Sequence, residues 1–385
     1  MKKICLVTNW YPTEENPFVG NFFREQALAM SNYADFVVLH YQFTEAFFVH
    51  KTKLELINKE RNIAEYRAIM QAGTLDKCVR KAFSLNKMNY HHFLLDETAE
   101  LLKNENIDIF YTVTGQSEAA ICARFANYFG KPYVVSEHGP FPWVGSTITQ
   151  ENRKAMEEAN AFLAISNDKI RQVLMQDTHI SNIHYVGNMV DDEVFVLEPS
   201  QNKTKTFIAV GSNSFYKNYP MLIESFNRLV GLTAIPFKLV IAGYQANKGY
   251  AKDSRQLEEK LKNSKFSERL ELIPSVPHSE MPKLYAKADA FVMTSIQEGQ
   301  PVSAIEAGCC GLPIFATRCG GIEDYVDEKM GRIVSILDAD GLAMCLKEFL
   351  EKPDLYDAGY IREQVKKRFG KKAFVQNMID AFESI

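Results

Sequence analysis

The fold of this chain is decided by the stretch Ala290-Phe-Val-Met-Thr-Ser-Ile-Gln-Glu298-Gly-Gln-Pro-Val-Ser-Ala-Ile-Glu306-Ala-Gly308. Its first four residues are apolar and predict a short buried strand, whereas residues 302–308 predict a helix. A strand, a loop and a helix in this order form the repeating unit of a doubly wound parallel sheet. Ligands of such sheets bind beyond the carboxyl ends of the strands, so the loop at 294–301 is expected to belong to a binding site.

The same alternation of β-rich runs and helical patterns extends over the rest of the chain. In the first half, strands are expected at Ile4–Thr8, Phe36–His40, Ile107–Val113, Tyr133–Glu137, Phe162–Ile165 and His184–Val186, with helices in the gaps. In the second half, they are expected at Thr206–Val210, Lys238–Ala242, Leu270–Ile273, Ala290–Met293, Ile314–Ala316 and Gly331–Val334. A polar break that carries a proline, near residues 197–204, separates the halves. The pattern predicts an α/β protein of two doubly wound, Rossmann-like domains.

Length and composition agree with this interpretation. The 385 residues exceed the roughly 250–300 at which a single hydrophobic core stops growing. Apolar residues make up 46% and charged residues 24%, which is typical of a globular protein and excludes disordered and collagen-like chains. The net charge of -4 lacks the basic footprint of a nucleic-acid-binding protein, so no nucleic-acid partner is expected.

The cysteines and the apolar runs bear on location. Seven cysteines without a C-x-x-C pair indicate reduced thiols buried as small hydrophobic residues, as in a cytoplasmic protein. Met1-Lys2-Lys3 leads into a short apolar run, which predicts no secretory signal, and no run of about 18 apolar residues is present to span a bilayer. We expect a cytoplasmic protein, with association at the inner face of the membrane left open.

Residues 51–92 contrast with the acidic balance of the chain, because nine Lys and Arg stand against four Asp and Glu. Phe83, Leu85 and Met88 are interleaved with basic residues, which suggests a charge-rich helical segment. Such a segment is typical of a solvated face. A basic amphipathic surface also suits peripheral contact with anionic lipid or with a phosphorylated acceptor, and both alternatives remain.

Two loops of the first half carry candidate site residues. Gly20 permits a close backbone approach and Asn21 can cap the helix that begins there, so an anion-accepting turn competes with a plain loop-to-helix junction. His138 follows the strand expected at 133–137 and precedes Gly139, which predicts an imidazole at the mouth of the first domain. A structural histidine is the alternative.

In the second half, Gly211, Ser212 and Asn213 follow the strand expected at 206–210, and Lys217 precedes the next helix. Small residues offer backbone N–H groups and a hydroxyl, and the lysine supplies a point charge, so this loop is suited to phosphate. It lacks the Walker A pattern, which argues against a P-loop NTPase.

The loop quoted first is the strongest candidate site. Pro301 is suited to the first helical position, so the N–H groups near Val302 and Ser303 are expected to face a diphosphate at the positive end of the helix. Glu298 lies before the helix and Glu306 inside it, which predicts contacts with different hydroxyls of one ligand and excludes a hydrolase dyad. Helix capping by Glu298 is the alternative.

No metal and no separate cofactor are expected. The one D-x-D triplet, Asp338-Ala-Asp340, precedes the helical pattern at 341–350, where helix capping is the better interpretation.

At these residues the chain resembles the retaining glycosyltransferases of GT-B architecture called family 4, or group 1. The motifs that carry the resemblance are Glu298-Gly-Gln-Pro, Glu306 after seven further residues, Ala307-Gly308, Gly311-Leu-Pro313 and Cys319-Gly-Gly-Ile-Glu-Asp324. The resemblance covers nearly the whole chain. It implies two domains facing across a cleft: an acceptor-side domain at 1–197, completed by crossover helices at about 366–385, and a nucleotide-sugar domain at 198–365.

The resemblance also implies roles for single residues. Glu298 would lie near sugar hydroxyls, Glu306 near the ribose, and Lys217 on phosphate, with a UDP- or GDP-sugar as donor substrate. Val276 and Pro277 match the position that brackets the nucleobase. The catalytic residues that we expect are His138, Glu298 and Lys217. The expected donor-binding residues are Gly20, Asn21, Gly211, Ser212, Asn213, Lys217, Val276, Pro277, Glu298, Gly299, Gln300, Pro301, Val302, Ser303 and Glu306.

Three departures from the family pattern affect these roles. Gly211-Ser-Asn213 replaces the usual Gly-Arg-Leu, which removes one phosphate cation unless Arg24 or Arg318 substitutes. Gln300 replaces an apolar residue, and Val186-Gly-Asn-Met-Val-Asp191 replaces a Pro-Asn-Gly version, so both can alter the choice of sugar.

The function implied by the resemblance is transfer of a sugar, with retention, from a nucleoside diphosphate sugar to a hydroxyl of a glycan or lipid-linked acceptor. Surface or capsular polysaccharide or glycolipid biosynthesis is the expected process. The alternative is a glycosyltransferase-like binding or scaffold protein that lost catalysis together with its phosphate arginine.

Overall fold

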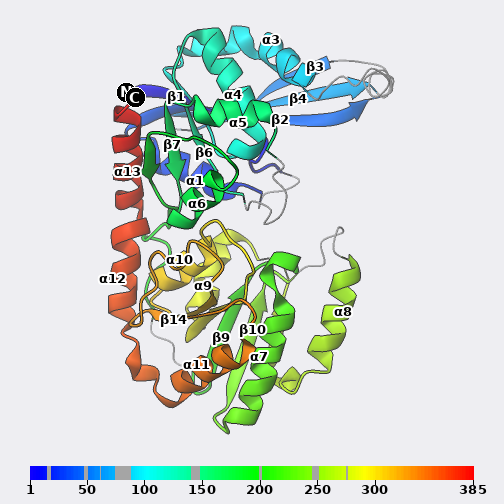
Figure 1. Ribbon diagram of the computed structural model, residues 1–385, viewed down its shortest axis with the longest axis vertical. Helices are drawn as coiled ribbons and strands as arrows, with labels where there is room; N and C mark the ends of the chain where they lie inside the picture. Colours follow the sequence, from blue (N-terminus) through cyan, green and yellow to red (C-terminus); the bar gives the residue numbers. More distant parts are fainter. Residues whose placement is uncertain are drawn as a thin grey trace. The chain divides into compact units, whose positions relative to one another are not determined.

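The computed structural model describes residues 1–14, 19–46, 51–60, 62–73, 88–139, 148–198, 202–244, 251–274 and 276–385. The chain forms two compact units, each of which takes residues from separate parts of the sequence (Figure 1). Unit 1 comprises Met1–Ile165, Ile170–Val186 and Val375–Ile385, and unit 2 comprises Ser166–Lys169 and Gly187–Phe374.

Unit 1 is built on an eight-stranded sheet of order β3-β4-β2-β1-β5-β6-β7-β8. Its strands are β1 (Lys2–Thr8), β2 (Ala34–Ala46), β3 (Lys51–Glu60), β4 (Ile63–Gly73), β5 (Ile109–Thr112), β6 (Tyr133–Ser136), β7 (Ala161–Ala164) and β8 (Ile183–Tyr185). Every neighbouring pair is parallel except β3 and β4. The helices are α1 (Asn21–Met30), α3 (Met88–Glu105), α4 (Gly115–Phe129), α5 (Gln150–Glu157) and α6 (Asn167–Leu174), the last of which begins in unit 2.

The C-terminal end of the chain completes unit 1. Helix α13 (Lys371–Glu383) enters this unit at Val375, and the two chain termini lie side by side (Figure 1). Phe382 is 3% exposed, its carbonyl accepts a hydrogen bond of 2.5 Å from Lys2 Nζ, and its ring meets Tyr111 edge-to-face. The first strand of the sheet is therefore fixed by one of the last residues.

The segment at 51–92 differs from the prediction. Instead of a charge-rich helix, its first part is an antiparallel pair of strands, β3 and β4, that extends the edge of the sheet next to β2. Lys53-Leu-Glu-Leu56 alternates polar and apolar residues, as strands do, and Leu54 packs against the core of the unit. Residues 74–87, which include Phe83 and Leu85, lie outside the described residues.

Unit 2 contains a six-stranded parallel sheet of order β11-β10-β9-β12-β13-β14. Its strands are β9 (Lys205–Val210), β10 (Phe237–Ala242), β11 (Leu270–Ile273), β12 (Ala290–Met293), β13 (Ile314–Thr317) and β14 (Gly331–Val334). The helices are α7 (Tyr219–Leu232), α8 (Ala251–Lys262), α9 (Met281–Tyr285), α10 (Val302–Cys309), α11 (Ala339–Glu351) and α12 (Ala358–Phe369). The order corresponds to 3-2-1-4-5-6, that of doubly wound dinucleotide-binding sheets. The predicted α/β class with two parallel sheets is confirmed.

Each unit has its own hydrophobic core. Phe207 of β9 contacts Phe226 and Phe237 in unit 2, and Phe110 of β5 stacks on Phe125 in unit 1. Burial on both faces explains why the parallel strands read as continuous apolar runs in the sequence.

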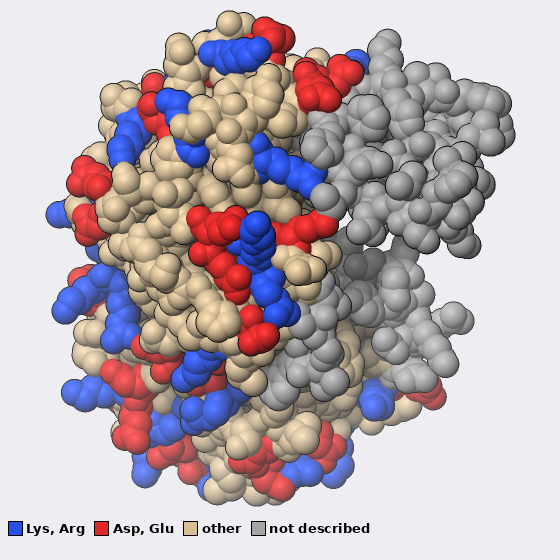
Figure 2. All heavy atoms as spheres, turned by 45° about the horizontal axis from the view of Figure 1, so that its top comes forward, with Lys and Arg blue, Asp and Glu red and all other residues tan. Residues whose placement is uncertain are grey.

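Figure 2 shows basic and acidic side chains interspersed over the displayed face of the described surface, without a broad basic field. Among the described residues, none of the helices combines the length and the apolar character that crossing a membrane requires.

Candidate functional site

The centre of the unit 2 sheet is its topological switch point. Strands β9 and β12 lie side by side, and the chain leaves them toward opposite edges of the sheet. Sheets of this kind bind ligands in the crevice outside such a point. The loops that follow the two strands are joined there, because Ile296 N donates to Tyr216 O at 2.7 Å and Thr294 Oγ1 donates to Lys217 O at 3.0 Å.

Lys217 and Glu298, one from each loop, form an ion pair at this point. The distance from Lys217 Nζ to Glu298 Oε1 is 2.8 Å, and about a fifth of each side chain is exposed, 21% and 20%. Ser295 Oγ donates to the same carboxylate oxygen at 2.7 Å. Two of the predicted catalytic residues are thus brought together within reach of solvent.

The loop after β9 brings Gly211 beneath Lys217. Gly211 has a φ of +148°, and a Cβ added there would lie 2.7 Å from Lys217 Cε. Its carbonyl accepts a hydrogen bond of 2.6 Å from Tyr219 Oη, while Ser212 is exposed and Asn213 is buried. The glycine therefore leaves room for the lysine stem, and Ser212 is the exposed member of the three.

Helix α10 begins beside Glu298 with an open N-terminus. Pro301 occupies the N-cap position instead of the predicted first helical position, which Val302 takes. No side chain caps the helix. Its first turn, which holds Val302 and Ser303, contains no acidic residue. No negative side chain in the first turn therefore offsets the positive end of the helix dipole.

The backbone between Glu298 and α10 is held from two sides. Ser166 Oγ donates to Gly299 O at 2.7 Å, and Gly321, with a φ of +69°, packs so closely that a Cβ there would lie 2.4 Å from the same oxygen. Gln300 is 4% exposed: its Oε1 accepts from Asn188 N at 2.5 Å and its carbonyl from Asn188 Nδ2 at 2.9 Å. The two departures at Gln300 and at 186–191 are therefore partners of each other.

The side chain of Glu306 on α10 is 6% exposed, and both of its carboxylate oxygens have polar partners. His278 Nε2 is 2.7 Å from Oε1, and Tyr285 Oη donates to Oε2 at 2.9 Å. Burial and the neighbouring carboxylate raise the pKa of Tyr285 well above its usual value, so its hydroxyl stays protonated and donates to Glu306. Neither partner was predicted from the sequence, although His278 directly follows the predicted Val276 and Pro277.

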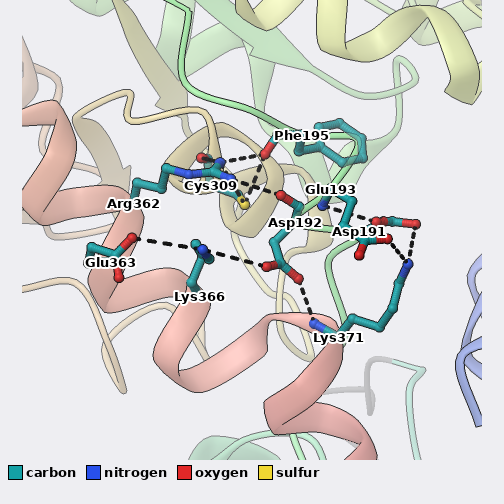
Figure 3. Close-up of polar contacts among 9 residues, drawn as sticks. All are labelled: Asp191, Asp192, Glu193, Phe195, Cys309, Arg362, Glu363, Lys366 and Lys371. Atoms are coloured by element: carbon teal, nitrogen blue, oxygen red, sulfur yellow. Dashed lines mark hydrogen bonds and ion pairs between the residues drawn. The ribbon is translucent and has the colours of Figure 1, made fainter.

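A polar cluster between α12, the start of α13 and the segment 191–195, which we call the Arg362 brace, holds that segment in place (Figure 3). Arg362 of α12 donates to the carbonyls of Phe195 and Cys309 through Nη1 and to that of Asp192 through Nη2. Asp192 Oδ1 also accepts from Lys371 N at 2.9 Å, at the start of α13. The brace comprises Asp191, Asp192, Glu193, Phe195, Cys309, Arg362, Lys366 and Lys371.

Gly20, Asn21 and His138 lie in unit 1. Gly20 has a φ of +66° and a Cβ there would lie 2.4 Å from Trp10 O, so glycine is required at this close approach. The prediction that Asn21 caps α1 is wrong, because Gly20 is the N-cap and Asn21 Nδ2 donates to Glu25 Oε1 at 2.7 Å instead. The His138 ring meets Phe23 of α1 edge-to-face at 4.8 Å.

The two cations considered as substitutes for the missing arginine differ in their surroundings. Arg24 Nε donates to Glu65 at 2.8 Å and its Nη2 to Glu60 at 3.1 Å, all within unit 1. Arg318 is exposed in unit 2 and lies after β13. Arg24 is thus already engaged by two carboxylates.

The D-x-D triplet is a helix cap, as predicted. Asp338 accepts a hydrogen bond of 2.7 Å from Gly341 N at the start of α11, and Asp340 pairs with Arg228. No group of three or more His, Cys, Asp or Glu side chains suited to a metal ion occurs among the residues that the structure describes.

Comparison with known proteins relates this arrangement to one family. Residues 191–373 match the family model described as Glycosyl transferases group 1. The chain is 30% identical over 301 residues to "Probable sucrose-phosphate synthase" of Thermosipho melanesiensis, which covers 67% of this chain and 68% of that protein.

Two solved structures share the fold. Sucrose-phosphate synthase from Thermosynechococcus elongatus has a TM-score of 0.76 at 16% identity, over 100% of this chain and 98% of that one. HepE from Anabaena, solved in complex with UDP, has a TM-score of 0.70 at 15% identity over 100% of both chains. The predicted GT-B architecture is confirmed.

Proposed function

Because the chain belongs to the glycosyl transferases group 1, we propose that it moves a sugar from a UDP- or GDP-sugar to an acceptor hydroxyl, with retention at the anomeric carbon. The observation that carries the proposal is the Lys217–Glu298 pair at the switch point, beside the open N-terminus of α10. In this proposal residues 198–365 hold the donor, and residues 1–197 with 366–385 form the acceptor side.

The proposed reaction is driven by charge. As the bond between the anomeric carbon and the diphosphate breaks, negative charge develops on the leaving phosphate, and the α10 N–H groups with Lys217 stabilise it. A lysine ammonium has three donors, and Glu298 takes one of them, which leaves two for phosphate oxygens. Glu298 keeps its second oxygen for a hydroxyl of the sugar. The reaction as proposed requires no metal ion.

Glu306 is the proposed ribose contact. Its oxygens accept from His278 and Tyr285, and each carboxylate oxygen has a second lone pair for a ribose hydroxyl. Val276 and Pro277, which precede His278, would bracket the base. A UDP complex of the structurally similar HepE supports a uridine donor.

On the acceptor side, Gly20, Asn21 and His138 are proposed to face the diphosphate and the transferred sugar. We extend the proposal to a glycan or lipid-linked acceptor in surface or capsular polysaccharide or glycolipid synthesis. The support is the basic excess of residues 51–92, of which Lys53 and Lys59 are exposed on β3. Peripheral contact with an anionic membrane surface from the cytoplasm would follow.

The test is ligand-induced thermal stabilisation with UDP-, GDP-, ADP- and TDP-sugars, since a ligand that binds only the native state raises Tm. We expect one base to give a shift that Glu306→Ala abolishes. The matched control is Glu280→Ala, which removes an exposed carboxylate two residues beyond His278.

Turnover separates the enzyme from the scaffold alternative. Release of nucleoside diphosphate from the selected donor, dependent on Lys217, is expected of the enzyme. A protein that binds a donor but never releases the diphosphate with any acceptor would be the decayed scaffold, and absence of any thermal shift at millimolar donor would contradict the donor site itself.

A further inference from the structure

Unit 1 contains a polar cavity for which the sequence gives no local signal. Its volume is about 290 Å³, at the lower end of small-molecule sites, so it suits one small polar group and not an oligosaccharide. The walls come from the loop after β1, the first turn of α1, and strands β2, β3 and β4. The lining includes Asn21, which we propose as a site residue on other grounds, together with Tyr11, Arg24, His40, Glu65 and Arg67.

One side of the cavity is internally neutralised. Glu65 is 6% exposed, and its Oε1 accepts hydrogen bonds from Arg24 Nε at 2.8 Å and from Tyr11 Oη at 2.5 Å. Arg24 reaches the half-exposed Glu60 as well. This group holds α1, β4 and the loop after β1 together. Its one guanidinium is compensated by two carboxylates, so it offers no free positive charge to an acidic ligand.

The charge balance differs at Arg67 of β4. Glu55 of β3 lies opposite Arg67 in the strand pair, but its carboxylate is already paired with Lys53 and does not line the cavity. Within the described residues, the buried Nε of Arg67 makes no hydrogen bond. Its neighbour on the adjacent strand is His40. Burial and the Arg67 charge lower the pKa of His40 to about 4, so the imidazole is neutral near pH 7. Glu14 lines the cavity too, but it is exposed. Arg67 is therefore a cation on the cavity wall with donor capacity to spare.

We propose that this cavity binds an acidic group, a carboxylate or a phosphate monoester, carried by a hydroxylated acceptor, with Arg67 as its counter-ion. A guanidinium offers two parallel N–H donors that match the oxygens of either group. The amides of Asn21 and Asn58 and the ring of His40 supply partners for neighbouring hydroxyls. The open N-terminus of α1, capped by no side chain and free of acidic residues in its first turn, adds positive potential at Asn21.

This inference rests on the proposed function, because it assigns the ligand to the acceptor. The experiment titrates the intact protein with D-glucuronate, glucose 6-phosphate and neutral glucose by calorimetry. We expect an acidic sugar to bind and glucose to bind at least about tenfold more weakly, since one charge-assisted contact is missing. Glucuronate and glucose 6-phosphate distinguish a carboxylate from a phosphate.

Arg67→Gln is expected to weaken binding of the acidic sugar by about tenfold or more, with Arg67→Lys intermediate. Lys154→Gln is the matched control, because it removes a positive charge from a 72% exposed side chain of α5 outside the cavity and is expected to change affinity less than about twofold. The bound acid should also raise the pKa of His40, followed by NMR of its imidazole, because it offsets the Arg67 charge.

Equal affinity for glucose and the acidic sugars, or acid binding that Arg67→Gln leaves unchanged, would overturn the inference. The same wild-type preparation is tested for donor-induced stabilisation. If a nucleotide-sugar donor raises Tm but the acidic sugar does not bind in an Arg67-dependent way, only the assignment of the cavity is contradicted. If no donor raises Tm, the proposed function is contradicted. If Arg67→Gln does not fold, Arg67→Lys and the His40 titration of the wild-type protein still test whether the cavity binds an acidic group.

Discussion

At the scale of the residue, Lys217 is the side chain on which the proposed chemistry depends most. Lys217→Ala removes a charge-assisted contact worth roughly 1.5–3 kcal/mol, so we expect diphosphate release to fall about ten- to hundredfold. Steady-state turnover with the donor selected by thermal shift measures the effect. The substitution also frees Glu298 of its cation, which gives the variant a second reason to bind an anionic donor poorly.

Lys238→Ala is the control for this variant, because Lys238 is exposed on β10 of the same unit. Its turnover is expected to match that of the wild-type protein. Equal turnover in Lys217→Ala would exclude Lys217 from donor binding and would favour a role confined to the ion pair.

His40 makes the stability of unit 1 depend on pH. Its pKa is lowered from 6.5 to about 4 in the folded protein, first by burial and then by Arg67. Between these values the unfolded chain binds more protons than the folded one, so stability is full above pH 6.5 and is lost as the pH falls toward 4. The part lost between pH 7 and pH 5 is about 2 kcal/mol.

Urea unfolding of the wild-type protein and of His40→Gln at pH 7 and pH 5 isolates this contribution. The wild-type protein should lose more stability on acidification than His40→Gln does, while His179→Gln, at an 86% exposed side chain, should follow the wild type. Identical acid losses in wild type and His40→Gln would show that His40 is not responsible.

At the scale of the element, the loop between β12 and α10 depends on the glycine turn after β13. A methyl group at Gly321 would have to displace Gly299 O and would occupy a strained left-handed conformation. We expect Gly321→Ala to lose most donor-induced stabilisation. Gly130→Ala is the matched control: its φ is +61°, nothing lies within 4 Å of the added Cβ, and only about 1 kcal/mol of strain is expected.

A Gly321→Ala variant with a normal donor shift would mean that the position of this loop does not matter for the donor. Melting temperatures of the two ligand-free variants separate strain from the clash. Both variants carry the left-handed strain, and only Gly321→Ala carries the clash.

The strands of unit 2 could be predicted to within a residue or two because buried parallel strands are short apolar runs between polar loops. The hairpin β3–β4 could not be predicted from the same reasoning, because half of the residues of β3 are charged. The alternation of Lys53, Leu54, Glu55 and Leu56 was the available signal, and the excess of lysine and arginine favoured a helical interpretation instead.

The candidate site was predictable where loops directly follow strands, as with Lys217 and Glu298. Partners supplied from elsewhere were not. Tyr285 reaches Glu306 from α9, and Asn188 holds Gln300 across 112 positions of sequence, so neither pairing leaves a local pattern. The polar cavity of unit 1 is assembled from five separate segments and is invisible for the same reason.

At the scale of the whole molecule, the dependence of unit 1 on Phe382 is testable. Phe382→Ala removes a buried ring that packs on Tyr111, which typically costs about 3–5 kcal/mol. We expect hydrogen exchange to accelerate in β1 and β5 and to change little in the strands of unit 2. Glu383→Ala, at the exposed neighbouring position, is the control.

Equal acceleration of exchange in both units would contradict this prediction and would mean that the two units unfold as one. A shorter protein that ends at Phe374 should show the same contrast more strongly. It lacks every residue of α13 that unit 1 takes up.

The position of residues 375–385 in unit 1 also orders events on the ribosome. The sheet of unit 1 is translated first, yet Lys2 finds its partner at Phe382 only after the whole of unit 2 has been synthesised. Unit 2 needs no residue that is synthesised after Phe374. Unit 1 is therefore begun before unit 2 and completed after it. A nascent chain in which only residues 375–385 are still inside the ribosome would present a complete second unit attached to an incomplete, chaperone-accessible first one.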